Sequence, residues 1–153
     1  MKFTVKTHRE DDGFLITFPD APGCVTECDD AADVPSVAAE ALEGWLEAHL
    51  VSGQVPPRPR PVTTGRAVEV GAILALKLEL LWARREAGLS QAAVAKLVGV
   101  SQQRIAALEH PDTEVKLSTA EAVMRALGRS LALASFPLAP PRKRSRLVAR
   151  AHA

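Results

Sequence analysis

The stretch LSQAAVAKLVGVSQQRIAALE, residues 89–109, predicts two short helices joined by a tight turn. Ser90 and Ser101 stand where a hydroxyl can cap the first turn of each helix. Gly99 lies between the helices, where a positive φ is required, and Ala95 is small enough for the helices to cross closely. This spacing is typical of a helix-turn-helix.

The apolar residues of this stretch divide it into an inner and an outer face. Four side chains are expected to turn inward and form the core of the motif: Leu97, Val100, Ile105 and Leu108. The residues left facing outward towards the N-terminal end of the second helix are Gln102, Gln103, Arg104, Ala106 and Ala107, next to the capping Ser101.

These outward residue types suit recognition of DNA. A Gln amide both donates and accepts, which matches the major-groove edge of adenine, and Arg can bind guanine or a phosphate. Gln91 begins the preceding helix, where backbone N–H groups and the helix dipole favour a phosphate. A helical core with a polar surface would also display Gln and Arg, but the complete pattern favours DNA binding. The candidate DNA-binding residues are Gln91, Ser101, Gln102, Gln103 and Arg104.

The first third of the chain has strand patterns instead. Apolar and polar residues alternate in KFTVKTH, and Asp12-Gly13 is a hairpin signal before FLITF. CVTEC predicts a third strand, and a helix over residues 34–50 follows Asp33. The order β-β-β-α before an all-helical region predicts an α+β fold.

The sequence divides into four segments: a first domain at 1–55, a proline-rich linker at 56–66, a helix-turn-helix domain at 67–137 and a basic, disordered tail at 138–153. The short stretch AVEV, residues 67–70, can form a fourth strand that returns to the first sheet or pairs elsewhere. The helix expected after residue 71 is apolar nearly all round, which predicts contact with more than its own domain.

Charge is segregated along the chain. Residues 1–55 hold 3 Lys/Arg and 11 Asp/Glu, whereas the remainder holds 16 Lys/Arg and 7 Asp/Glu. This segregation indicates two modules with partners of opposite sign: nucleic acid for the basic one, a cationic partner for the acidic one.

Several classes of protein are excluded by what the sequence lacks. The strand interiors carry no carboxylates, so the converging set that a metal-dependent nuclease needs is missing. Cys24 and Cys28 are expected to be reduced thiols, and the scattered His residues do not complete a metal site. We therefore expect no catalytic residues, no metal and no cofactor, hence no enzyme. No stretch is typical of a membrane span or a signal peptide, so we expect a cytoplasmic protein.

The second domain resembles the Xre-type helix-turn-helix family, which includes phage repressors. The resemblance rests on GLSQ at 88–91, GVS at 99–101 and LE at 108–109, with Ala95 and Ile105 between them. It implies base contacts by Gln102 and Gln103. It also implies that Gln91 binds a phosphate and the neighbouring Gln. Ala107 departs from the third Gln of a similar repressor helix, so no operator sequence is carried across.

The first domain is similar to the HicB antitoxin family, which has a partial RNase H-like β-β-β-α(-β) domain. The matching turn is FPDAPG, residues 18–23, and the stretch VEVGAILALKLELLWARREAGLSQ is similar to the join in HicB proteins that end in an Xre-type helix-turn-helix. ECDDAAD at 27–33 departs from the family, which usually has a Gly there.

The resemblance to HicB implies an antitoxin of a toxin-antitoxin system. Its first domain would bind and mask a small, basic HicA-type ribonuclease toxin that cleaves mRNA, and its second domain would repress its own operon as a homodimer or larger homo-oligomer. Acidic steering of a cationic toxin agrees with the charge of the first domain. The candidate toxin-binding residues are Asp11, Asp12, Glu27, Asp29 and Asp30.

A different function stays open at this point. The chain can also be a stand-alone transcriptional repressor whose first domain senses a small ligand or mediates assembly. That alternative predicts a pocket in the first domain and no toxin partner. A nuclease that uses the RNase H-like fold would require converging carboxylates, which this sequence lacks.

Overall fold

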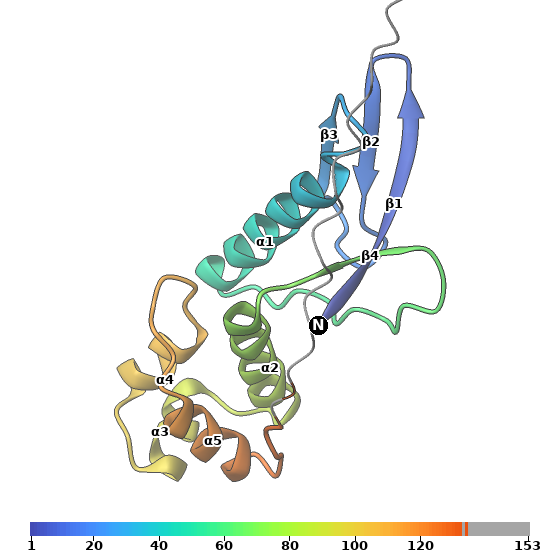
Figure 1. Cartoon of the computed structure of the whole chain (residues 1–153). Coiled ribbons are helices and arrows are strands. Elements are labelled where there is room, and N and C mark those ends of the chain that lie inside the picture. The colour runs from blue at the N-terminus through green and yellow to red at the C-terminus, as the bar shows by residue number, and fades with distance from the viewer. Residues whose placement is uncertain (133, 135–153) are drawn as a thin grey trace, which may run out of the picture.

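The computed structural model describes residues 1–132 and residue 134. Its strands and helices form a sheet-containing part and a helical part, with α2 between them (Figure 1). The elements follow the order β1 (Lys2–Glu10), β2 (Gly13–Thr17), β3 (Val25–Cys28), α1 (Val34–Ser52), β4 (Arg66–Glu69), α2 (Ala72–Glu86), α3 (Gln91–Val98), α4 (Gln102–Glu109) and α5 (Leu117–Ala126). The predicted α+β fold is confirmed.

The four strands form one antiparallel sheet in the order β3-β2-β1-β4. β1 pairs with β2 along its second half, from Lys6↔Thr17 to Glu10↔Gly13, and with β4 along its first half, from Lys2↔Glu69 to Val5↔Arg66. The alternation of apolar and polar residues in β1 places Phe3 and Val5 in the core and their neighbours on the other face.

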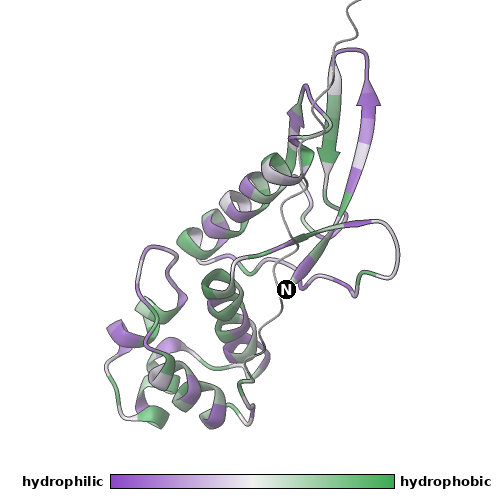
Figure 2. Ribbon diagram, viewed as in Figure 1, coloured by the Kyte–Doolittle hydropathy of each residue, from purple (hydrophilic) through white to green (hydrophobic). Residues whose placement is uncertain are grey.

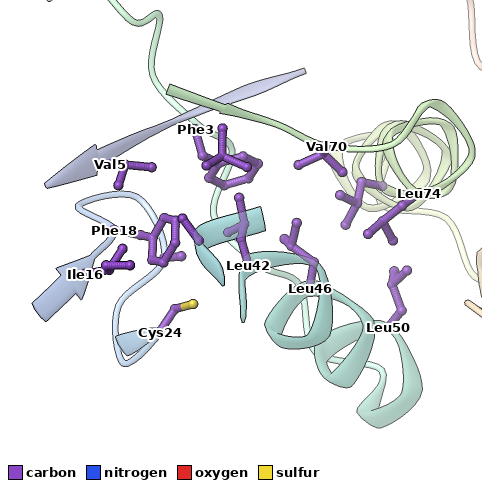
Figure 3. Packing of buried hydrophobic residues seen from close by; sticks show 14 of the residues in the cluster. Phe3, Val5, Ile16, Phe18, Cys24, Leu42, Leu46, Leu50, Val70 and Leu74 are labelled. Atoms are coloured by element: carbon purple, nitrogen blue, oxygen red, sulfur yellow. The ribbon is translucent and has the colours of Figure 1, made fainter. Parts of the chain in front are cut away.

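Helix α1 supplies the other half of the first core. A stripe at helical spacing is buried, consisting of Val34, Ala38, Leu42, Leu46 and Leu50. These side chains meet Phe3, Ile16, Phe18 and Cys24 from the sheet side (Figure 3). The buried stripe fixes α1 on one face of the sheet.

Helix α2 belongs to both cores, as its all-round apolar pattern predicts. Leu74, Leu78 and Trp82 pack in the cluster of the sheet. Leu80 and Ala83 pack in the second cluster, which is formed with α3, α4 and α5. One rigid helix therefore joins the two parts, and Figure 2 shows apolar residues along it.

The structure corrects the predicted boundary between the domains. Residues 67–70 were grouped with the helical domain, but β4 pairs with β1, and Val68 and Val70 are buried in the first core. The first structural unit therefore continues to about residue 70. The reason is tertiary: β1 offers a strand partner that a local pattern cannot reveal.

The proline-rich linker is also more ordered than expected, because it docks on α2. Pro56 is buried, and its carbonyl oxygen accepts a hydrogen bond from Trp82 Nε1 at 2.7 Å. The Arg58 guanidinium lies 4.5 Å from the centroid of the Trp82 ring, and it pairs with Glu79 and Glu86 at 2.9 Å. Farther along, Arg60 pairs with Asp20 at 2.7 Å.

The predicted basic tail at 138–153 lies outside the described residues, as does the end of the predicted helix-turn-helix domain. In the part of the chain that the structure describes, no helix is long and apolar enough to cross a membrane. Within the same part, no group of three or more His, Cys, Asp or Glu side chains is arranged to hold a metal ion. Cys24 and Cys28 are free thiols.

Candidate DNA-binding and partner-binding surfaces

Both helices of the predicted motif begin at a side-chain cap. The hydroxyl of Ser90 accepts from the backbone N–H of Ala93 at 3.1 Å, and that of Ser101 accepts from Arg104 at 3.3 Å. Between the helices, Gly99 has φ +73°, and its N–H donates to Ala95 O at 2.9 Å. A residue with a Cβ rarely adopts this conformation, so Gly99 sets the angle between α3 and α4.

The start of α4 is a polar, exposed surface. Ser101, Gln102, Gln103 and Arg104 are all exposed, whereas Ile105 and Leu108 of the same helix are buried in the second core. Four of the five candidate DNA-binding residues therefore lie together on the exposed first turn of α4. Their base contacts stay a prediction.

One part of the predicted core of this motif is wrong. Leu97 is 60% exposed, whereas Val94, one turn earlier, is fully buried in its place. The inward face of α3 is thus formed by Val94 and Ala95, because the crossing of α3 with α4 turns Leu97 outward. Val100 is partly buried, as the pattern indicated.

Gln91, the fifth candidate, is partly buried and engaged within the domain. Its Nε2 donates to Glu109 at 2.9 Å, and the same carboxylate accepts from Arg84 Nε at 2.5 Å and Nη2 at 2.7 Å. Arg84 also donates to the carbonyl oxygen of Leu89 at 2.9 Å. This network ties α2 to the end of α4, and sequence patterns alone did not identify it.

Lys77 is a second buried cation of α2. Its contacts were not predicted from the sequence. It is 1% exposed, and its ammonium donates to Pro111 O at 3.0 Å, to Thr113 O at 2.5 Å and to His110 O. Burial lowers the pKa of Lys77 from its ordinary value. The ammonium binds the loop that follows α4, so α2 holds α4 in place through both Arg84 and Lys77.

The predicted partner-binding acids gather at one end of the sheet. A hollow of about 690 Å³ is lined by the β1–β2 turn and the end of β3, with Glu10, Asp11, Asp12, Gly13, Phe14, Glu27, Cys28 and Asp29. Four of the five candidate residues are in this lining. Asp30 lies next to it, where its carboxylate accepts from the N–H of Ala32 at 2.9 Å.

Cys28 lies among the acids at this end. Desolvation, followed by the charges of Asp33, Asp29 and Asp30, raises the pKa of the Cys28 thiol. Asp20, in the turn FPDAPG, is a different kind of acid, because its side chain is only 6% exposed and is paired with Arg60. Asp20 is therefore paired with a cation and does not belong to the acidic hollow near Asp12.

Two protein families match successive parts of the chain. A family described as HicB_like antitoxin of bacterial toxin-antitoxin system matches residues 3–70. A helix-turn-helix family matches residues 80–133. The first match ends just after β4, in agreement with the corrected boundary.

Similar whole proteins are antitoxins. Antitoxin HicB 2 of Photorhabdus laumondii is 29% identical over 137 residues, which cover 89% of this chain and 97% of that protein. Antitoxin HicB of Escherichia coli strain K12 is 25% identical over 122 residues, which cover 79% of this chain and 88% of that protein. A solved chain of a HicA3 and HicB3 toxin-antitoxin complex has 29% identity and a TM-score of 0.38, over 40% of this chain and 72% of that one.

The order of the two matched families is the order of the two structural units, and α2 joins them. The relatives span both units, so the likeness does not rest on the helix-turn-helix alone. Over both of its units the chain is therefore similar to HicB antitoxins: residues 3–70 match the HicB-like antitoxin family, and residues 80–133 match a helix-turn-helix family.

Proposed function

We propose that the sheet-containing unit binds and neutralises a small, basic ribonuclease toxin of the HicA type. The observation that carries this proposal is the acidic hollow at the end of the sheet, where Asp11, Asp12, Glu27 and Asp29 meet. An RNA-binding toxin carries a cationic face, and a complementary acidic surface both steers its approach and competes with RNA for that face. The chain acts by binding and masking, not by catalysis.

The test is binding to a small, basic HicA-type protein, sought in the adjacent reading frame, with matched charge reversals. Asp12→Lys with Asp29→Lys places two cations in the hollow. Glu40→Lys with Glu47→Lys makes the same change of net charge on exposed positions of α1. We expect the first pair to lose co-purification of the toxin and rescue of growth, while the second pair keeps both. Equal loss in both pairs would show that the hollow has no special part in binding.

We propose in addition that the helical unit binds operator DNA and represses its own operon. The exposed first turn of α4 would enter the major groove, where Gln102 and Gln103 contact bases and Arg104 contacts a base or a phosphate. The Gln91 side chain donates its hydrogen bond to Glu109, so a phosphate near the start of α3 would instead be bound by backbone N–H groups and the helix dipole. One such helix reads few base pairs, so two copies would bind a divided operator.

The DNA test compares two sets of Gln→Ala substitutions in gel-shift assays at a fixed salt concentration. Gln102→Ala with Gln103→Ala should remove discrimination between operator and unrelated DNA and leave toxin binding unchanged. Gln54→Ala, an exposed Gln after α1, is the control and should bind as the unmodified chain does. Unchanged discrimination in the double variant would contradict the assignment of these base contacts.

A further inference from the structure

The second half of β1 has a free edge. β4 pairs with β1 only from Lys2 to Val5, and β2 occupies the opposite edge from Lys6 to Glu10. Among the residues that the structure describes, no strand lies on the β4 side of Lys6–Glu10, and Figure 1 shows this half of β1 at the rim of the sheet. An edge with unpaired main-chain groups is a template for another strand.

The main-chain groups that point outward can be identified from the ladder. Glu10 and Gly13 flank the two-residue turn of the hairpin, so they form a hydrogen-bonded pair, and Lys6 and His8 follow the same alternation towards β2. The N–H and C=O groups of Thr7 and Arg9 therefore point to the free side. The bond from Val70 N to Met1 O at 2.9 Å agrees, because odd-numbered residues face β4.

We propose that this edge pairs with the same edge of a second copy, which joins two sheets into one continuous antiparallel sheet. The two-fold axis passes at His8, so Thr7 of one copy and Arg9 of the other form hydrogen-bonded pairs. Lys6 of one copy then stands opposite Glu10 of the other, and His8 stands opposite His8. Each hydrogen-bonded pair satisfies the free main-chain groups of both strands.

Charge and sterics select this register among the antiparallel ones. An axis at Thr7 would set Arg9 against Val5, whose edge β4 already covers. An axis at Arg9 would set two guanidinium groups against each other. The axis at His8 pairs Lys6 with Glu10 twice, and both are exposed on the sheet face that α1 does not cover. Thr17 and Gly13 are their neighbours on β2, so neither has an ion pair across that ladder.

The pairing surface is small, so we expect weak association by itself. Binding of two helix-turn-helix units to one operator would raise the effective concentration of the two sheets and strengthen it. The inference depends neither on the toxin nor on the identity of the operator, because self-association is measured on this chain alone. Of the residues involved, Glu10 also lines the acidic hollow, whereas Lys6, Thr7, His8 and Arg9 do not. Failure of one proposal is therefore distinguishable from failure of the other.

A charge swap tests the inference in the full chain. Lys6→Glu sets two glutamates opposite each other and Glu10→Lys sets two lysines, so each should weaken one association step by roughly tenfold or more. The combination of Lys6→Glu with Glu10→Lys exchanges the charges and should restore it. Sedimentation equilibrium over a concentration series measures the three variants. Absence of restoration, or a mass that none of the variants changes, would overturn the proposal.

Cross-linking tests the register directly, in a Cys28→Ser background. Residues opposite each other in a pair without hydrogen bonds have Cα atoms about 4.5 Å apart, which suits a disulfide. His8→Cys should therefore form a covalent dimer on oxidation, whereas Lys6→Cys, on the same face, should not. Efficient cross-linking by Lys6→Cys, or none by His8→Cys, would exclude the register. In the Lys6→Glu chain, whose substitution lies outside the acidic hollow, loss of toxin binding without loss of self-association would assign the edge to the toxin instead and would also overturn the proposal.

Discussion

Arg84 of α2 and Glu109 at the end of α4 form a bidentate ion pair, with N···O distances of 2.5 and 2.7 Å and side chains only 5% and 9% exposed. The pair joins the helix that both cores share to the helix predicted to read DNA. Gln91 completes the coordination of the carboxylate. The position of α4 therefore depends on a residue that precedes the motif.

Removing one partner of this pair should destabilise the helical unit strongly. Arg84→Met leaves a buried carboxylate without its cation, for which we expect a loss of about 3–5 kcal/mol in the free energy of unfolding. The double variant, Arg84→Met with Glu109→Met, should lose less of the free energy of unfolding, because it leaves no unpaired charge buried. Urea unfolding monitored by circular dichroism measures both. Arg85→Met, at the exposed neighbouring position, is the control, and an equal effect there would contradict the prediction.

The length of a fragment should decide whether the sheet-containing unit folds alone. A fragment ending at residue 55 lacks β4 and the α2 side chains Leu74, Leu78 and Trp82, which belong to the first core. We expect it to lack a cooperative thermal transition, whereas a fragment ending at residue 88 should unfold cooperatively. Differential scanning calorimetry compares them. A cooperative transition in the shorter fragment would show that the strands and α1 suffice.

Docking of the linker should weaken in acid. Hydrogen bonds from Arg58, opposed by desolvation and assisted by the charges of Arg58 and Arg129, lower the pKa of Glu86 from its ordinary 4.5. A carboxyl group with a lowered pKa in the folded state stabilises it fully above its ordinary pKa, and this contribution is lost as pH falls through the lowered pKa.

The matching measurement compares Glu86→Gln with the parent chain. The difference in melting temperature should be fully present above pH 4.5 and should shrink as the pH falls below that value. A Trp45→Phe background leaves Trp82 as the single tryptophan, so its fluorescence reports the linker contact. A difference that is constant with pH would exclude titration of Glu86 as the cause.

Gly13 should tolerate no side chain, because the backbone of β3 lies too close. A Cβ at this position would stand 2.6 Å from the carbonyl oxygen of Cys28 and 3.2 Å from Asp29 Cα. Gly13→Ala should therefore destabilise the chain by about 1–3 kcal/mol and disturb the acidic hollow. Gly44→Ala, inside α1 with open space around it, should stabilise by about 0.5–1 kcal/mol. Thermal melts compare the two, and a neutral Gly13→Ala would contradict the close approach.

Local sequence determined the elements and much of their order. Four features depend on residues within a few positions of each other, so they could be predicted: the alternation in β1, the hairpin signalled by Asp12-Gly13, whose turn residues are Asp11 and Asp12, the serine caps and the left-handed Gly99. The exposed first turn of α4 follows from the same local pattern. For these features, short-range sterics and hydrogen bonding are sufficient.

Only the tertiary structure decided which distant groups meet. The pairing of β4 with β1, the burial of Val94 in place of Leu97 and the ion pair of Arg84 with Glu109 each join segments whose separation no local periodicity encodes. The docking of Pro56 on Trp82 likewise turned a predicted spacer into part of the core. These contacts form because buried polar and apolar groups must find partners, and a partner is chosen by the folded packing and not by the local sequence.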